Sequence, residues 1–298
     1  MQPLATVLAV GLAVTRLPAA QAPQGADLWR LAGAALARPA ALVGGSTARL
    51  WNPAPLSDSP RSSAGVQVLQ TPDVVGLSGL VAGASTWIGS RIETGVIGGR
   101  MDVDDLVRTT TSPVSSGSIP VYAQFVGVNA GARLGMVTLG ALVSLHDVRF
   151  DLDHSDGFTT DLGVRVVPFE RLTVAAATHW LPADLSDQPN TDFFAGAQYA
   201  IREAPIWGAR ARVTARYGIT LRQHTDADHT VGLGLVLDDQ FSVDGAWARE
   251  TAFGVSQWRP EVAVAFRVGH YTVAVGRGGG LNGLGPTYRI GLDAGARP

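Results

Sequence analysis

The sequence contains no cysteine and no lysine, and charged residues make up only 16% of its 298 positions. The missing cysteine excludes a disulfide framework and thiolate chemistry. The charged fraction lies below the roughly 25% that is usual for soluble domains. The formal net charge of −2 gives bulk electrostatics no means of attracting nucleic acid. What the chain does have is 36 glycines and 46% hydrophobic residues, a composition that suits a turn-rich β protein.

The beginning of the chain has the form of an export signal. Leu4 to Val14 is an apolar run that is too short to span a bilayer as a helix, which takes about 20 residues. Residues 20–22 (Ala-Gln-Ala) have the A-x-A form of a cleavage site. We therefore expect residues 1–22 to be a signal peptide, with a buried strand or helix as the alternative. An exported chain without another apolar helix is periplasmic, secreted or an outer-membrane barrel.

The stretch from Ala209 to Arg222 carries the clearest structural pattern in the sequence. Apolar residues occupy its odd positions, and its even positions carry four arginines together with Thr and Gly. This period of two is that of a β-strand. A strand with one apolar and one arginine-bearing face fits the wall of a membrane barrel, with lipid outside and water inside. A soluble β-sandwich, which would turn the apolar face toward a protein core, is the alternative.

Similar strand patterns recur along the rest of the chain, about fourteen in all. The predicted strands are 65–70, 75–86, 91–99, 120–130, 134–145, 158–167, 172–180, 191–202, 209–222, 230–237, 241–250, 261–268, 271–276 and 287–294. We therefore predict an all-β fold, an antiparallel transmembrane β-barrel of about 14 strands.

The connections alternate between short and long from the fourth strand onward. Short turns are expected near 131–133, 168–171, 203–208, 238–240 and 269–270, and long loops at 147–157, 181–190, 223–229, 251–260 and 277–286. Outer-membrane barrels have short periplasmic turns and longer outer loops. The connection 100–119, with a predicted short helix at 103–108, then lies on the outer side, and both termini are periplasmic.

Aromatic and charged residues fit the same arrangement. Aromatic residues fall at predicted strand ends, where interfacial girdles form: Trp87, Tyr199, Trp207 and Tyr271 on the periplasmic side, Trp180, Trp247 and Trp258 on the outer side. Predicted inward positions are Asp161, Arg165, Thr173, His179, Gln198, Arg210, Arg212, Arg216, Asp244, Glu261, Arg267, Arg289 and Asp293. These side chains either form Arg–carboxylate pairs across the lumen or merely solvate it.

A short motif follows an Ala- and Leu-rich stretch, residues 26–42, whose helical spacing at Leu28, Leu31, Ala35 and Leu36 ends at Pro39. After Gly44-Gly45, the sequence reads Trp51-Asn52-Pro53-Ala54-Pro55-Leu56. This segment resembles the amino-terminal motif of the FadL-like outer-membrane proteins, which include long-chain fatty-acid transporters and PorV-type barrels. Pro55 replaces the family's glycine. A surface turn before the first strand is the alternative reading.

The resemblance implies a 14-stranded barrel whose amino-terminal segment folds into the lumen as a hatch. The expected organisation is a signal peptide at 1–22, a hatch segment at 23–62 and a barrel at 63–298. In this reading Trp51, Asn52, Pro53 and Ala54 form the hatch turn. Arg210, Arg212 and Arg216 are candidate luminal partners for a carboxylate head group.

The leading functional hypothesis is passive transport of small hydrophobic molecules such as fatty acids through a monomeric outer-membrane barrel. A PorV-like scaffold or secretion partner is the main alternative, and a soluble periplasmic or secreted β protein is the third. We expect no enzyme activity, cofactor or metal. The G-x-G-x-x-G match at 278–283 precedes a strand instead of a helix, the acidic loop 151–156 departs from the EF-hand pattern, and no G-x-S-x-G occurs.

Overall fold

The computed structural model describes residues 24–33, 35–56, 60–71, 76–104, 106–109, 115–181, 190–206, 208–222, 226–252, 255–280 and 285–296. The predicted signal peptide at 1–22 lies outside these residues. Among the described helices, none is long and apolar enough to cross a membrane.

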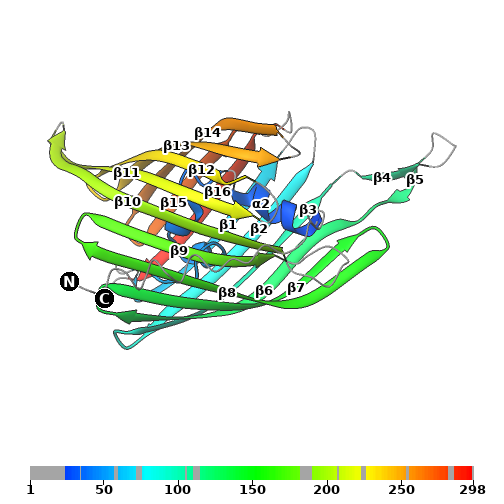
Figure 1. The fold of residues 1–298 in the computed structure, drawn as a ribbon, viewed down its shortest axis with the longest axis horizontal. Helices are drawn as coiled ribbons and strands as arrows, with labels where there is room; N and C mark the ends of the chain where they lie inside the picture. The colour runs from blue at the N-terminus through cyan, green and yellow to red at the C-terminus, as the bar shows by residue number, and fades with distance from the viewer. Residues whose placement is uncertain are drawn as a thin grey trace.

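Fourteen antiparallel strands close into a barrel in which β1 pairs with β16 (Figure 1). The strands are β1 (Ser62–Thr71), β2 (Leu77–Ile88), β3 (Ile92–Val103), β6 (Val121–Leu134), β7 (Val137–Phe150), β8 (Asp153–Phe169), β9 (Leu172–Leu181), β10 (Asn190–Ile206), β11 (Ala209–Arg222), β12 (Asp228–Leu237), β13 (Phe241–Ala252), β14 (Val255–Val268), β15 (Tyr271–Gly278) and β16 (Thr287–Ala296). The predicted barrel is therefore confirmed. Because it is closed, it leaves no unpaired sheet edge.

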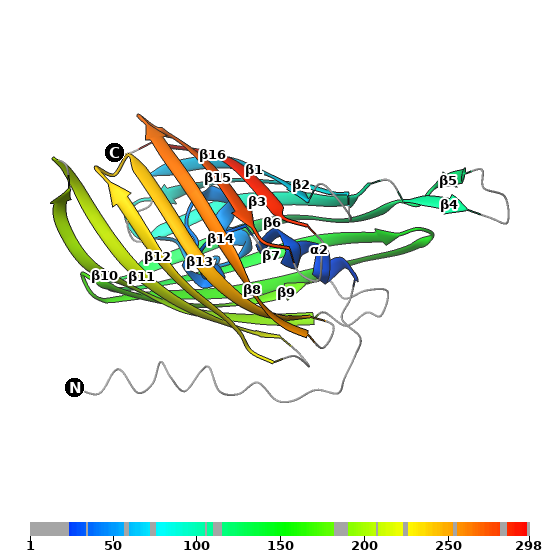
Figure 2. The same ribbon diagram turned by 90° about the horizontal axis from the view of Figure 1, so that it is seen from above.

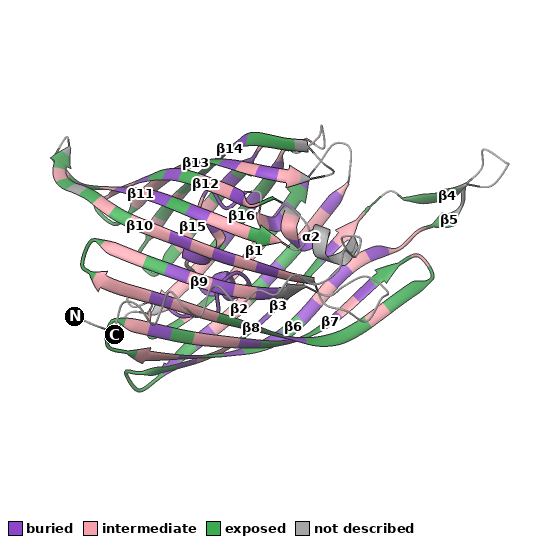
Figure 3. Ribbon diagram, viewed as in Figure 1, coloured by how far each residue is buried: buried purple, intermediate pink, exposed green. Residues whose placement is uncertain are grey.

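Each strand separates an apolar outer face from an inner face, as the period-two pattern predicts. On β11, Tyr217 is 47% exposed on the outer face, whereas Arg216 beside it is 5% exposed on the inner face. Figure 3 shows exposed positions alternating with buried ones along the strands. Many of the exposed positions are large apolar residues, such as Val143 and Leu233. A continuous apolar outer surface around a closed barrel is the property of a membrane-spanning barrel, so the sandwich alternative is wrong.

Two predicted long loops are instead extensions of the wall. Strands β7 and β8 run on to a two-residue turn at Asp151–Leu152, and β13 and β14 nearly meet across 253–254. The strand pairing continues through both segments, up to Phe150↔Asp153 and Ala252↔Val255. The prediction of loops at 147–157 and 251–260 is therefore wrong, because sequence composition does not show how far two strands stay paired.

Two other local predictions are wrong. The expected helix at 103–108 is replaced by the end of β3 and by β4 (Val107–Thr109), which pairs with β5 (Ser115–Ser118) in a hairpin projecting from the barrel (Figure 2). The expected turn at 131–133 lies within β6, and the chain turns at Gly135, where φ is +65°. A positive φ favours glycine, so Gly135 marks this turn, whereas the residues 131–133 chosen from the sequence continue the strand.

The aromatic prediction is confirmed in part. Tyr199 and Tyr271 are exposed near one end of the barrel, and Trp247 and Trp258 near the other. The prediction for Trp87 is wrong, because its side chain lies on the inner face of β2. It is 8% exposed there and packs under the guanidinium of Arg133. Trp207 and the side chain of Trp180 lie outside the described part of the structure.

The chain that precedes β1 lies inside the barrel. It contains α2 (Gln24–Gly33) and two short 3-10 helices, η1 (Ala40–Leu42) and η2 (Ser46–Leu50). Figure 2 shows these elements surrounded by the strands. Residues 35–56, called the luminal segment below, are buried at nearly every position. The hydrophobic core therefore lies in the lumen, between this chain and the inner faces of the strands.

Candidate functional site

The Trp51-Asn52-Pro53-Ala54 motif forms a buried turn inside the barrel. The side-chain oxygen of Asn52 accepts a hydrogen bond from the Ala54 amide at 2.9 Å, the local turn that Asn favours before Pro. Its amide group donates to the Ala41 carbonyl at 2.8 Å. Asn52 is 0% exposed, so both halves of its side chain are satisfied by the luminal segment itself.

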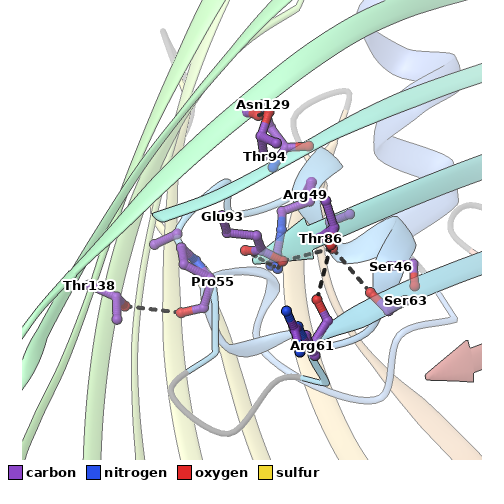
Figure 4. A network of polar contacts seen from close by, with 12 residues as sticks. Ser46, Arg49, Pro55, Arg61, Ser63, Thr86, Glu93, Thr94, Asn129 and Thr138 are labelled. Carbon is purple, nitrogen blue, oxygen red and sulfur yellow. Dashed lines mark hydrogen bonds and ion pairs between the residues drawn. The ribbon is translucent and has the colours of Figure 1, made fainter. Parts of the chain in front are cut away.

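The wall contacts this turn from two sides. Arg165 of β8 donates to the carbonyls of Ala54 (3.1 Å) and Val43 (2.5 Å). Thr138 of β7 donates to the Pro55 carbonyl at 3.0 Å (Figure 4). Pro55, which departs from the family motif, therefore takes part in a defined contact.

Glycines in the wall allow the luminal segment to approach the strands closely. An added Cβ at Gly131 would lie 2.6 Å from the Pro55 ring, and one at Gly83 would lie 2.7 Å from the Ser46 carbonyl oxygen. Added Cβ atoms at Gly140 and Gly163 would collide with Pro53 and Asn52. Contacts this short are not available to any residue with a side chain. The inner wall is therefore shaped to the path of the segment.

Carboxylates of the wall bind the amino-terminal chain around the barrel. Figure 4 shows one of them, Glu93 of β3, accepting from Arg49 at 2.7 Å. The other pairs are Arg30 with Asp192 (2.9 Å), the Ala37 amide with Glu261 (3.1 Å), Arg38 with Asp244 (2.8 Å) and the Ser46 amide with Asp293 (2.9 Å). Buried charged hydrogen bonds hold geometry more strongly than neutral ones.

One side of the lumen around α2 is apolar. Leu28, Trp29 and Ala32 of α2 are buried, and the Trp29 ring meets Phe125 of β6 edge-on with centroids 4.9 Å apart. The wall contributes Leu69, Leu77, Val81, Ile97, Met101, Val121 and Leu142 to this cluster. Strands β1, β2, β3, β6 and β7 thus present an apolar surface toward the interior. Helix α2 covers it at β6, and η2 of the luminal segment covers it at β1 and β2.

The opposite side of the lumen is charged. On β11 to β14, Arg222 contacts Asp228 (2.5 Å) and Glu250 (3.3 Å), and Arg259 contacts Glu250 (2.5 Å) and Glu261 (3.5 Å). Every one of these side chains is at most 13% exposed. The pairing that the sequence left open is therefore present. Helix α2 matches both surfaces, with its apolar face on one wall and Arg30 on Asp192 near the other.

The three predicted ligand-binding arginines lie in different environments. Arg216 is buried and pairs with Asp244 and with Gln198, whose side-chain oxygen is 2.7 Å away. Arg212 is 45% exposed and contacts Asp239 at 3.2 Å near the end of the barrel. Arg210 is exposed beside the β10–β11 turn. The structure does not bring these three side chains to one point, so a shared role for them stays a prediction.

A cavity of about 790 Å³ lies between the luminal segment and the end of the barrel at which every connection between wall strands has two or three residues. The opposite end has the short turn at Asp151–Leu152 but also the long connection 104–120. Its wall includes the turn residues Gly135, Glu170 and Gln240, and it also includes buried arginines such as Arg165, Arg216 and Arg289. We call it the basic chamber. Short turns mark the periplasmic end of an outer-membrane barrel, so the basic chamber faces the periplasm.

A buried histidine lies beside the motif. The Nδ1 atom of His179 is 2.7 Å from Asp161, and its ring packs near Trp51 and Phe194. Among the described residues no group of three or more His, Cys, Asp or Glu is placed to hold a metal ion. The His179 and Phe194 rings of the wall lie 6.2 Å and 6.0 Å from the Trp51 ring, measured between centroids.

Solved structures with a similar fold include proteins whose names refer to toluene or monoaromatic hydrocarbons. The toluene transporter TbuX of Ralstonia pickettii shares 12% identity at a TM-score of 0.53, over 87% of this chain and 96% of that one. The toluene transporter TodX of Pseudomonas putida shares 11% at 0.51, over 87% and 96%. The CymD monoaromatic hydrocarbon channel shares 9% at 0.52, over 88% and 99%. No family model and no curated protein matches the sequence.

These findings define the class of protein. The chain is an outer-membrane β-barrel with an apolar outer surface. Its interior is apolar on one side and charged on the other, and the amino-terminal chain fills it. Within that class it has the FadL-like fold, as the Trp51–Ala54 motif predicted. At identities near 10% the likeness establishes the fold alone.

Proposed function

We propose that the protein is a passive channel for small hydrophobic molecules across the outer membrane. The observation that carries this proposal is the apolar half of the lumen, which the apolar face of α2 covers at β6. Movement of α2 would uncover Phe125, Met101 and their neighbours to a solute that enters from the outside. Burial of apolar surface is favourable by about 25 cal/mol per Å², so these side chains would favour hydrophobic solutes.

The route requires a coordinated movement of the amino-terminal chain. We infer that α2 leaves first, since it meets the wall through an apolar face and the Arg30–Asp192 ion pair, whereas the luminal segment is held by four carboxylates and by contacts to its backbone. The segment then acts as the hatch between the apolar lumen and the basic chamber. The names of TbuX, TodX and CymD, which refer to toluene and monoaromatic hydrocarbons, support apolar solutes in general. Fatty acids are the narrower proposal from the sequence motif.

The test is uptake by cells that express the chain, with toluene and oleate as radiolabelled probes. Because the chain has no cysteine, a pair introduced by Arg30→Cys and Asp192→Cys can be joined by a reducible bis-thiosulfonate crosslinker. We expect uptake above that of vector-only cells, loss of uptake on crosslinking and recovery on reduction. Each single cysteine variant is the control. Uptake equal to that of vector-only cells for both probes would remove the proposal.

A scaffold role is the second candidate, and the projecting hairpins favour it. The β4–β5 hairpin stands beyond the barrel (Figure 1), and Arg108 on it pairs with Asp151 in the β7–β8 turn. Leu152 in that turn is 78% exposed. A scaffold should retain a protein partner when it is purified from native membranes, and uptake should then be unaffected by the crosslink.

A further inference from the structure

The basic chamber contains more positive than negative side chains. Eight arginines and four carboxylates line it. Asp239 at its mouth already pairs with Arg212, and Asp293 accepts from the Ser46 amide. A single carboxylate, that of Asp244, pairs with both Arg38 and Arg216. The deepest part of the chamber therefore holds an excess of guanidinium groups.

Arg289 adds a third guanidinium at this place. Its side chain is 8% exposed and lines the chamber, and its Nε has no hydrogen-bond partner among the described residues. Arg38 repels it electrostatically, while Asp293, Glu261 and Asp244 attract it from a distance. Leaving a buried donor of a charged group unsatisfied is costly. The cost is removed when an acceptor enters the chamber.

The strand register places Asp244 and Arg289 on one row of the wall, and we call the part of the chamber in front of this row the recess. Asp244 of β13 is level with Ala263, Gly276 and Arg289 on the next three strands. Ala263 lines the chamber with a single methyl group, whereas the space over Gly276 is occupied by the Ala35 carbonyl, whose oxygen would lie 2.5 Å from an added Cβ. Arg38 reaches the same row from the luminal segment through its contact with Asp244.

We propose that this recess binds an oxyanion, the carboxylate or phosphate group of a small solute, through Arg38, Arg216 and Arg289. Guanidinium groups present paired donors that match the oxygens of such groups. Asp244 lowers the excess charge without cancelling it, because two arginines share it. The site opens toward the periplasmic end, so it is separate from the apolar lumen and goes beyond passive passage of neutral solutes.

The test is calorimetric titration of the refolded full-length protein in neutral detergent. The probes are sodium octanoate, inorganic phosphate and 1-octanol, each measured against micelles alone. We expect saturable binding of octanoate, phosphate or both, and none of octanol. Octanoate binding would identify a carboxylate-bearing amphiphile as the ligand, and binding of phosphate alone would identify a free anion.

Arg289→Gln should weaken the binding about tenfold or more, since a charged hydrogen bond is lost. The matched control is Arg277→Gln, which removes a guanidinium from the neighbouring strand β15 on the exposed outer face. A heat-modifiability gel verifies that each variant is folded. If Arg289→Gln does not fold, Arg38→Gln tests the same recess from the luminal segment.

Two results would overturn the site: no saturable binding of either anion, or equal weakening by Arg277→Gln. The outcome is distinguishable from that of the channel proposal. Uptake of toluene without anion binding rejects the site and keeps the channel, whereas anion binding without uptake does the opposite.

Discussion

Small side chains on the inner wall determine where the luminal segment lies. Gly163 of β8 faces the Asn52 side chain, and Gly140 beside it faces Pro53. The segment has little freedom to move away, because Arg165 and Thr138 hold the next carbonyls. At this scale a single methyl group is enough to disturb the fit.

We predict that Gly163→Ala destabilises the folded barrel by about 1 to 3 kcal/mol, the usual cost of overpacking. The added methyl would displace Asn52 and strain its two hydrogen bonds. Urea unfolding of the protein in detergent measures the change. Gly157→Ala on the same strand is the control, since nothing lies within 4 Å of its added Cβ. Equal effects of the two substitutions would contradict the prediction.

Sequence alone predicted which residues face the lumen but not which residues pair. Alternation placed Arg216 and Asp244 inside, and the structure buries both. Their contact depends on strand stagger and on Arg38, which reaches Asp244 from a segment 206 positions away. The wall glycines could not be recognised from the sequence either. A glycine that allows the close approach of another backbone cannot be told from a glycine that forms a turn.

Helix α2 is the element best placed to move. Its contacts with the wall include an apolar face and the Arg30–Asp192 pair, whereas the luminal segment is held by backbone contacts and four carboxylates. Elements with few fixed contacts open locally at low free energy. The sequence predicted helical spacing from Leu28 to Leu36 with an end at Pro39, whereas α2 ends earlier, at Gly33.

We predict that Arg30→Gln increases the opening of α2 about tenfold, in proportion to a loss of about 1.4 kcal/mol. The absence of cysteine provides the measurement. Ala32→Cys places one thiol at a position that is 3% exposed, and maleimide can reach it when the helix opens. Its labelling rate should rise in the Arg30→Gln background and stay unchanged with Arg277→Gln. Identical rates in all three backgrounds would show that the ion pair does not retain the helix.

At the scale of the whole molecule, the apolar outer surface indicates that lipid surrounds the barrel. Leu233 is 60% exposed at the middle of β12, and in water such exposure would make its replacement nearly neutral. We predict that Leu233→Arg costs about 2 to 4 kcal/mol, the value for a charge on the lipid face near the bilayer centre. Unfolding from lipid vesicles measures it.

The control is Leu152→Arg in the β7–β8 turn. Leu152 is 78% exposed, but it lies beyond polar outward residues such as Asp147 and Arg149 and therefore outside the lipid. Its substitution should have an effect near zero. A similar small effect at Leu233 would contradict the membrane assignment. The number of strands was predictable from the sequence because each strand repeats the same alternating pattern. The lengths of the hairpins beyond the membrane were not predictable, because they depend on strand pairing and not on the alternation of apolar residues.

Ser46 touches both sides of the seam where the first and last strands meet. Its amide donates to Asp293 on β16, and its carbonyl lies over Gly83 on β2, with β1 between them. The luminal segment thus links β16 to β2 across the β1–β16 junction, where the two ends of the sheet join. Withdrawal of the segment would remove this link and leave the β1–β16 ladder alone to close the barrel. Release of the segment would therefore also lower the stability of the closed barrel.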